Sequence, residues 1–243
     1  MKYVGIALLS LLGLFFAYIL LLIVSALFVS RKKEYGTNSR YYRFLLNSST
    51  AIGLPILGVK VILTGEEKIP KDKRFLLVSN HRSCYDPIVT WRALAKYDVA
   101  FISKASNFKV PVWGQLIKNC AFLPIDRSSP RRSMETLNKA AELIKNDVVS
   151  FGIYPEGTRS HTDEMLPFHN GIFVAAEKTK VPIVVMAVRN TDIIHKRVVF
   201  RRTKAYLDVI DVITPERYEG LRSSEIGNIV RRDLEDFFKE IKK

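Results

Sequence analysis

The stretch FLLVSNHRSCYDPIVTW, residues 75–91, decides how the chain folds around its most polar loop. Phe75–Ser79 is a short apolar run typical of a buried strand, and Pro87 is typical of a first helical position. His81 and Asp86 therefore lie in a loop between a strand and a helix. From five residues away, the aspartate can turn back to Nδ1 of the histidine and leave Nε2 free as a base. A helix-capping Asp86 and an ordinary structural His81 explain the same spacing, so this loop alone does not decide the function.

Working outward from this loop, strand-like runs alternate with helical patterns along the chain. Strands are predicted over Phe75–Ser79, Val99–Ser103, Ala121–Ile125, Val148–Ile153, Ile183–Val188 and Val198–Ile210. Helices are predicted over Pro87–Lys96, Arg131–Lys145, Gly171–Thr179 and Ser224–Lys242, the last of them packed on the sheet. This alternation predicts an α/β domain with a mixed sheet flanked by helices.

The N-terminal residues predict a membrane anchor. No charged residue occurs from Tyr3 to Val29. This run exceeds both the roughly 20 residues that cross a bilayer and the apolar stretch of about 7–15 residues in a secretory signal. Basic residues follow at 31–33, so the positive-inside rule predicts that the rest of the chain lies at the cytoplasmic face. The pattern leaves open whether the helix spans the bilayer or lies in one leaflet.

Phe44–Leu63 is also apolar, but polar residues and glycines interrupt it, so we expect at most a second membrane-associated segment there. The expected division of the chain has three parts. Residues 1–30 form a membrane helix, residues 31–62 form a juxtamembrane linker with the possible second segment, and residues 63–243 form the α/β domain.

Composition narrows the possible functions. The formal charge of +14 indicates an anionic partner, such as lipid head groups or a phosphorylated substrate. The only cysteines, Cys84 and Cys120, have no metal-type spacing, so we expect no metal site and no disulfide framework. The sequence also lacks a Walker loop and a Gly-x-Ser-x-Gly elbow, which leaves nucleotide-binding and serine-hydrolase functions without support.

A second motif, YPEGTRS at residues 154–160, makes the first one informative. With both motifs in place, the chain resembles the glycerolipid acyltransferases, in particular those that acylate 1-acyl-glycerol-3-phosphate. That family carries Asn-His-x4-Asp, matched at residues 80–86, and Phe-Pro-Glu-Gly-Thr-Arg-Ser, matched at 154–160 with Tyr154 in place of Phe. Two further family blocks are matched by Lys104, Pro111, Gly114, Asp126 and Arg127, and by Val181–Val188.

The resemblance implies transfer of an acyl group from acyl-CoA or acyl-acyl carrier protein to the 2-hydroxyl of lysophosphatidic acid, giving phosphatidic acid. It implies that His81 is the general base, that Asp86 orients it, and that no bound cofactor or metal is needed. The substrate-binding residues implied by the family blocks are Lys104, Arg127, Glu156, Gly157, Thr158 and Arg159. Membrane lipids are the expected partners, and nucleic acid is not.

Individual roles can be expected for some of these residues. Arg159 suits a phosphate clamp, because a guanidinium binds two phosphate oxygens at once. We expect Glu156 to hold Arg159 or the hydroxyls of the acceptor, since a free carboxylate would repel the phosphate. Backbone N–H groups around Gly157 are one candidate for the oxyanion donor.

Three departures from the family pattern keep alternatives open. Ala105-Ser106 replace an acidic residue, Cys120 replaces a glycine, and His169-Asn170 replace a basic pair. The last change removes positive charge near the presumed phosphate site, so another lysophospholipid remains a possible acceptor. Cys84 could also serve as a nucleophile that forms an acyl-enzyme. A non-catalytic membrane-tethered module for anionic lipid or nucleic acid would explain the charge but not the two motifs.

Overall fold

A seven-stranded sheet forms the centre of the structure, a computed structural model that describes residues 2–30, 34–162, 164–196 and 202–241. The order across the sheet is β1-β7-β6-β2-β5-β3-β4. Strands β6, β2, β5, β3 and β4 run parallel, whereas β7 is antiparallel to β6 and parallel to β1. The strand bounds are β1 Val59–Thr64, β2 Leu76–Ser79, β3 Val99–Lys104, β4 Leu123–Ile125, β5 Ser150–Ile153, β6 Ile183–Arg189 and β7 Thr203–Ile213. The mixed α/β sheet expected from the sequence is confirmed.

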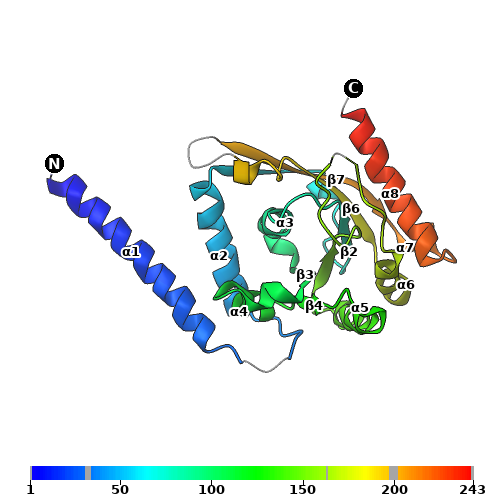
Figure 1. Cartoon of the computed structure of the whole chain (residues 1–243), viewed down its shortest axis with the longest axis horizontal. Helices are drawn as coiled ribbons and strands as arrows, with labels where there is room; N and C mark the ends of the chain where they lie inside the picture. The colour runs from blue at the N-terminus through cyan, green and yellow to red at the C-terminus, as the bar shows by residue number, and fades with distance from the viewer. Residues whose placement is uncertain (1, 31–33, 163, 197–201, 242–243) are drawn as a thin grey trace.

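Helices cover both faces of this sheet (Figure 1). On one side lie α2 and α3, with α4 beside them, and on the other lie α5, α6 and α8. Their bounds are α2 Arg40–Ile56, α3 Asp86–Ala93, α4 Trp113–Lys118, α5 Pro130–Lys145, α6 Val174–Thr179, α7 Pro215–Tyr218 and α8 Ser223–Glu240. The predicted packing of the last helix is confirmed, because Ile226, Val230 and Leu234 of α8 are buried.

The predicted elements match the structure with a few differences. The helix expected at Gly171–Thr179 begins as a 3-10 turn over Asn170–Phe173 and continues as α6. The strand expected at Val198–Ile210 is β7, which begins at Thr203; residues 198–201 of that prediction lie outside the described residues. The short helices α4 and α7 were not predicted.

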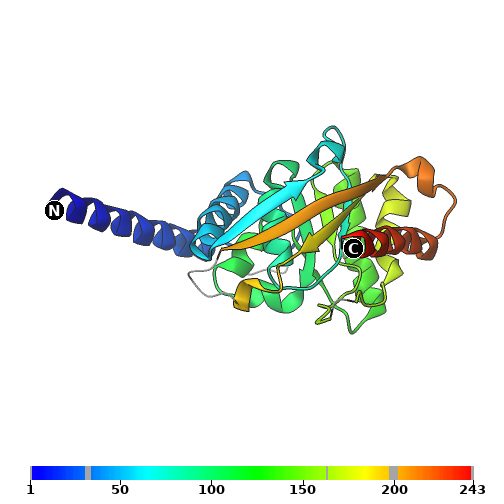
Figure 2. The same cartoon turned by 90° about the horizontal axis from the view of Figure 1, so that it is seen from above.

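The N-terminal helix α1, Lys2–Leu27, projects from the body (Figures 1 and 2). It is the one helix among the described residues that is long and apolar enough to cross a membrane. Only its last turns are covered by the body, where Leu22, Ser25 and Ala26 are buried. This makes α1 a candidate membrane anchor, and its orientation in a membrane stays a prediction.

The region predicted as a linker with a possible second membrane-associated segment contains a helix and a strand that were not predicted. Leu45, Leu46 and Leu54 of α2 are buried against the body, and β1 begins at Val59. The expected boundary between residues 62 and 63 therefore cuts through the first strand of the sheet. The apolar residues of α2 lie on two faces of the helix. One face is buried against the body, and the other, which includes Phe44, is exposed.

Candidate active site

The carboxyl ends of the parallel strands bring the two motifs together. His81 follows β2, the motif at 154–160 follows β5, and Lys104 ends β3. Since β2 pairs with β5 and β5 with β3, all in parallel, these residues lie at the same edge of the sheet. That edge is where open parallel sheets place their ligand sites.

His81 and Asp86 form the predicted pair. Nδ1 of His81 lies 2.8 Å from Oδ2 of Asp86, which also accepts hydrogen bonds from the N–H groups of Arg82 at 2.7 Å and Ser83 at 2.8 Å. Asp86 is fully buried, whereas the His81 side chain is 15% exposed. Among the described residues nothing bonds to Nε2 of His81, so that nitrogen is available to a substrate. The alternative of a helix cap at Asp86 is wrong, because the carboxylate turns back into the loop instead of bonding to the helix.

Thr191 completes the environment of Asp86, and sequence reasoning missed it. It lies just beyond β6, is completely buried, and its hydroxyl donates a hydrogen bond to Oδ1 of Asp86. The only available signal was positional: a residue that follows the predicted strand at 183–188 must lie at the same edge as His81.

Asn80 fixes the beginning of the loop that carries His81 and Asp86. Its side-chain amide accepts from the N–H of Val188 at 2.8 Å and donates to the carbonyl of the same residue at 2.9 Å. The buried amide thus continues the pairing of β2 with β6 by one more step. This arrangement explains a motif in which asparagine directly precedes the histidine.

The second motif holds the backbone of His81 on both sides. Oε1 of Glu156 accepts the N–H of His81 at 2.7 Å, and the N–H of Ser160 donates to the carbonyl of His81 at 2.8 Å. Oε2 of Glu156 accepts the N–H of Leu166 at 2.8 Å. Burial raises the pKa of Glu156 above its ordinary value, and the two N–H donors partly offset that effect. The expectation that Glu156 holds Arg159 is wrong, because both of its oxygens bind backbone amides.

Tyr154 sets the plane of the imidazole. Its ring stacks on His81 with centroids 4.5 Å apart and on Phe101 with centroids 6.1 Å apart. Its hydroxyl lies 3.4 Å from the Thr90 hydroxyl, and burial raises the pKa of Tyr154 well above its ordinary value. The tyrosine that replaces the family's phenylalanine therefore remains a neutral packing group.

Gly157 occupies a position that only glycine fits well. Its φ is +66°, and a Cβ atom there would lie 2.7 Å from Cδ2 of His169. Its N–H donates to the carbonyl of Tyr154 at 3.1 Å, so this amide is not free for an oxyanion. An oxyanion donor among the other backbone N–H groups around Gly157 stays a prediction. Thr158 and Arg159 follow at the surface, and no hydrogen bond or ion pair of the Arg159 guanidinium is found within the described residues.

Lys104 ends a strand that is two places away from β2 in the sheet, and Arg127 follows a strand that is three places away. Strands lie about 4.8 Å apart, so Lys104 on β3 is about 10 Å from the β2 loop and Arg127 beyond β4 is about 14 Å away. Both side chains are exposed at the same edge. They can add positive potential to one side of the site, but only a long substrate would reach them from the histidine.

The two residues that replace the family's basic pair have structural contacts. His169 packs against Gly157, and its N–H donates to the carbonyl of Pro155 at 2.8 Å. Asn170 lies against Gly227 of α8, where a Cβ atom would collide with its amide oxygen. Asn170 is thus used to seat α8 and does not replace the lost positive charge.

Comparison with known proteins shows the family of the chain. The acyltransferase family model matches residues 60–189, which is more than half of the chain. The chain belongs to the acyltransferase family. The matched region contains both motifs, and the resemblance inferred from them is confirmed.

Two 1-acyl-sn-glycerol-3-phosphate acyltransferases are similar in sequence to this acyltransferase. It is 32% identical to the 1-acyl-sn-glycerol-3-phosphate acyltransferase of Saccharomyces cerevisiae over 190 residues, which are 76% of this chain and 62% of the yeast protein. A Haemophilus influenzae protein of the same name is 27% identical over 179 residues, which are 72% of this chain and 71% of that protein. The acyltransferase therefore spans less than two thirds of the yeast relative's length.

A solved structure shares the fold. The crystal structure of the 1-acyl-sn-glycerophosphate acyltransferase PlsC from Thermotoga maritima aligns with a TM-score of 0.68 at 24% identity. The alignment covers 100% of this acyltransferase and 98% of that chain. The shared architecture thus extends to the N-terminal helices.

Proposed function

We propose that this acyltransferase moves an acyl group from a thioester donor, acyl-CoA or acyl-acyl carrier protein, to the 2-hydroxyl of lysophosphatidic acid. The observation that carries the proposal is the His81–Asp86 pair, because Nε2 of His81 has no partner among the described residues. Arg159 also has no partner there, and it directly precedes Ser160, whose N–H donates to the carbonyl of His81. The names of the relatives support the acceptor. Formation of phosphatidic acid from lysophosphatidic acid, tested with each donor in detergent, is the experiment that decides it.

The geometry supports a direct transfer. Nε2 of His81 takes the proton of the acceptor hydroxyl while its oxygen attacks the thioester carbon. The resulting tetrahedral intermediate collapses with cleavage of the carbon–sulfur bond, and the imidazolium returns the proton to the leaving thiolate. Asp86 stabilises the imidazolium, and its own charge is held by Arg82 N–H, Ser83 N–H and Thr191.

Arg159 is the residue proposed to bind the acceptor phosphate. Ser160 is hydrogen-bonded to the His81 backbone, so the adjacent Arg159 starts from a fixed point beside the catalytic loop. Its guanidinium is exposed and has no partner among the described residues, which leaves it free to bind phosphate oxygens in pairs.

Replacing Arg159 by alanine is expected to lower kcat/KM for lysophosphatidic acid by roughly 10- to 150-fold. This follows from the loss of about 1.5–3 kcal/mol for hydrogen bonds to a charged group. Activity on monoacylglycerol, which lacks the phosphate, should not fall. Steady-state kinetics with both acceptors provide the measurement, and an equal loss on both would contradict a phosphate-binding role.

Replacing Thr191 by valine is expected to lower kcat by roughly 10-fold, because it leaves Oδ1 of the buried Asp86 without its hydroxyl donor. Valine keeps the shape of the side chain, and serine, which restores the hydroxyl, should recover most of the rate. In an Asp86→Asn background the Thr191→Val change should lower kcat little further, since both changes act through the His81–Asp86 pair. Full additivity of the two changes would argue against this coupling.

The replacement of the family's basic pair by His169-Asn170 favours one alternative, an acceptor with a different head group. A panel of lysophospholipids at equal concentration tests it. Preference for lysophosphatidic acid supports the proposal, whereas preference for a larger head group identifies the alternative.

We further propose that α1 anchors the protein with its catalytic edge accessible from the cytoplasmic face, on the basis of the basic residues at 31–33.

A further inference from the structure

A groove between α2 and α3 has a volume of about 430 Å³, and most of the surface that lines it is apolar. It is lined by Arg40, Arg43, Phe44, Asn47, Ser48, Ala51, Arg92 and Asp98. Since α3 starts at the carboxyl edge of the sheet with Asp86, Arg92 near its other end lies at the amino edge, as does Asp98 just before β3. The groove is therefore on the opposite edge from the catalytic loop, and the proposed reaction does not use it.

The internal charges of the groove are partly paired. Arg43 is buried, donates to the carbonyls of Asp98 and Val99 at 3.3 Å, and stacks over Trp91 at 5.0 Å. It also forms an ion pair with Asp98, with 3.5 Å between the closest atoms. The charges of Arg43 and Asp98 thus satisfy each other, and Arg43 connects α2 to the sheet.

Arg40 and Arg92 are left as exposed cations in the same groove. No hydrogen bond or ion pair engages either guanidinium in the part of the chain that the structure describes. Ser39 precedes α2 without capping it by its side chain, so the first N–H groups of the helix have no side-chain cap. Asn47 adds a buried side-chain oxygen without a partner. These features fit an anionic ligand that also carries a hydroxyl donor.

The groove opens beside α1. Ser48, one of the lining residues, lies 2.7 Å from the hydroxyl of Tyr18, and the hydroxyl of Tyr41 lies 2.6 Å from that of Ser25. Phe44 at the rim is 65% exposed, although it is a large apolar side chain. Both charged and apolar residues of the groove are thus close to the candidate membrane helix.

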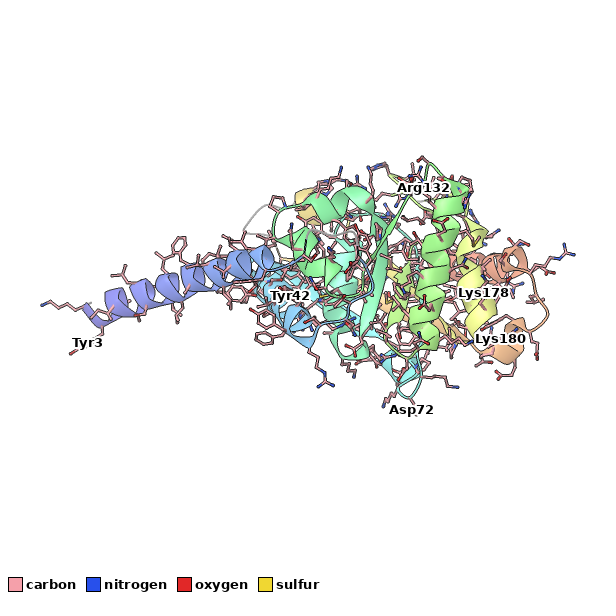
Figure 3. All side chains as sticks on the ribbon, turned by 90° about the horizontal axis from the view of Figure 1, so that it is seen from below. Tyr3, Tyr42, Asp72, Arg132, Lys178 and Lys180 are labelled. Atoms are coloured by element: carbon pink, nitrogen blue, oxygen red, sulfur yellow. The ribbon has the colours of Figure 1, made fainter. Side chains whose placement is uncertain are left out.

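The length of α1 indicates where the groove would lie relative to a bilayer. The 26 residues of α1 extend over about 39 Å, whereas the hydrocarbon core is about 30 Å thick. The body contacts α1 only near its C-terminal end; Figure 3 shows Tyr42 near this junction and Tyr3 at the far tip. With about 30 Å of α1 in the hydrocarbon core, Ser25 and the first turn of α2 beside it lie at the level of the head groups, whereas Ser48 beside Tyr18 lies deeper.

We propose that this groove binds the phosphodiester head group of an anionic phospholipid, with Arg40 and Arg92 on the phosphate and Phe44 beside the acyl chains. The proposal rests on the membrane anchoring by α1 given under the proposed function, and it does not depend on the acyl-transfer reaction. The same chemistry would bind free phosphate, so the experiment must separate these two sources.

The test uses the full chain in detergent and follows its thermal unfolding. The ligands are short-chain phosphatidylglycerol, short-chain phosphatidylcholine and inorganic phosphate at equal concentrations. The variant Arg40→Gln/Arg92→Gln is compared with Arg131→Gln/Arg132→Gln, a charge-matched control on α5 away from α1 (Figure 3). Wild type and control are expected to gain roughly 3–6 °C with phosphatidylglycerol at tenfold excess over Kd, and the groove variant to gain little.

Three outcomes would overturn the proposal. They are an unchanged shift in the groove variant, an equal shift with phosphatidylcholine, and a full shift with inorganic phosphate alone. Acyl transfer to lysophosphatidic acid is measured on the same samples. The groove variant should keep the detergent activity of wild type, so a failure of the proposed enzyme function and a failure of the groove proposal are distinguishable.

Discussion

Replacing His81 by alanine is expected to lower kcat for phosphatidic acid formation by roughly 10²- to 10⁴-fold, the usual contribution of a positioned general base. The acceptor alcohol holds its proton tightly at neutral pH, so transfer without a base is slow. Nε2 is the only ring nitrogen of His81 left free, because Nδ1 faces Asp86. The measurement is the initial rate with lysophosphatidic acid and the preferred donor, in detergent, at saturating substrate.

The control variant is Cys84→Ser, which tests the competing acyl-enzyme mechanism in the same loop. Cys84 is exposed, and the serine variant is expected to keep most of the wild-type rate. Both variants should unfold near the wild-type temperature, because His81 contributes one stacked ring and Cys84 lies at the surface. A Cys84→Ser protein without activity beside an active His81→Ala protein would reverse the assignment of the two residues.

Replacing Asp86 by asparagine is expected to reduce kcat by a similar factor, roughly 10²- to 10⁴-fold. The Oδ2 atom accepts from Nδ1 of His81 and from two backbone N–H groups, and Oδ1 accepts from Thr191. An amide nitrogen cannot accept, so asparagine must turn its NH₂ group either toward these donors or toward Thr191. Where it faces Nδ1, the histidine proton moves to Nε2 and the base is lost.

The same substitution should also lower the free energy of unfolding by about 1–3 kcal/mol, because at least one buried donor loses its acceptor. Rate and thermal unfolding are therefore measured on one preparation. A folded Asp86→Asn protein with wild-type kcat would show that the carboxylate is structural only. The Asp86→Ala protein is a less useful comparison, since it opens a cavity and leaves every surrounding donor unpaired.

The loop that carries His81 and Asp86 was predictable because the sequence features that define it are close together in the chain. A short apolar run, a polar turn and a proline lie next to each other in the sequence, and the five-residue spacing allows the contact between His81 and Asp86. Thr191 could not be assigned a role from sequence, because its partner lies 105 residues away and a single threonine after a strand has no distinctive pattern.

Glu156 was misplaced for a different reason. Its charge suggested a charged or substrate partner, whereas its partners in the structure are the uncharged backbone N–H groups of His81 and Leu166. The packing of the region from Phe44 to Leu63 could not be predicted, because hydrophobicity alone does not tell a membrane from a protein interior. Its polar residues on α2 are compatible with both surfaces, and only the packing of Leu45, Leu46 and Leu54 separates them.

The double attachment of His81 to the motif at 154–160 has a consequence for building chimeric enzymes. Glu156 and Ser160 bind the N–H and carbonyl of His81, so the position of the imidazole depends on a segment about 75 residues further along the chain. The two motifs therefore form one structural unit, although many residues separate them in the sequence. A single recombination point placed between them separates parts that have to match, whereas points outside both motifs move the whole segment together and leave the pair intact.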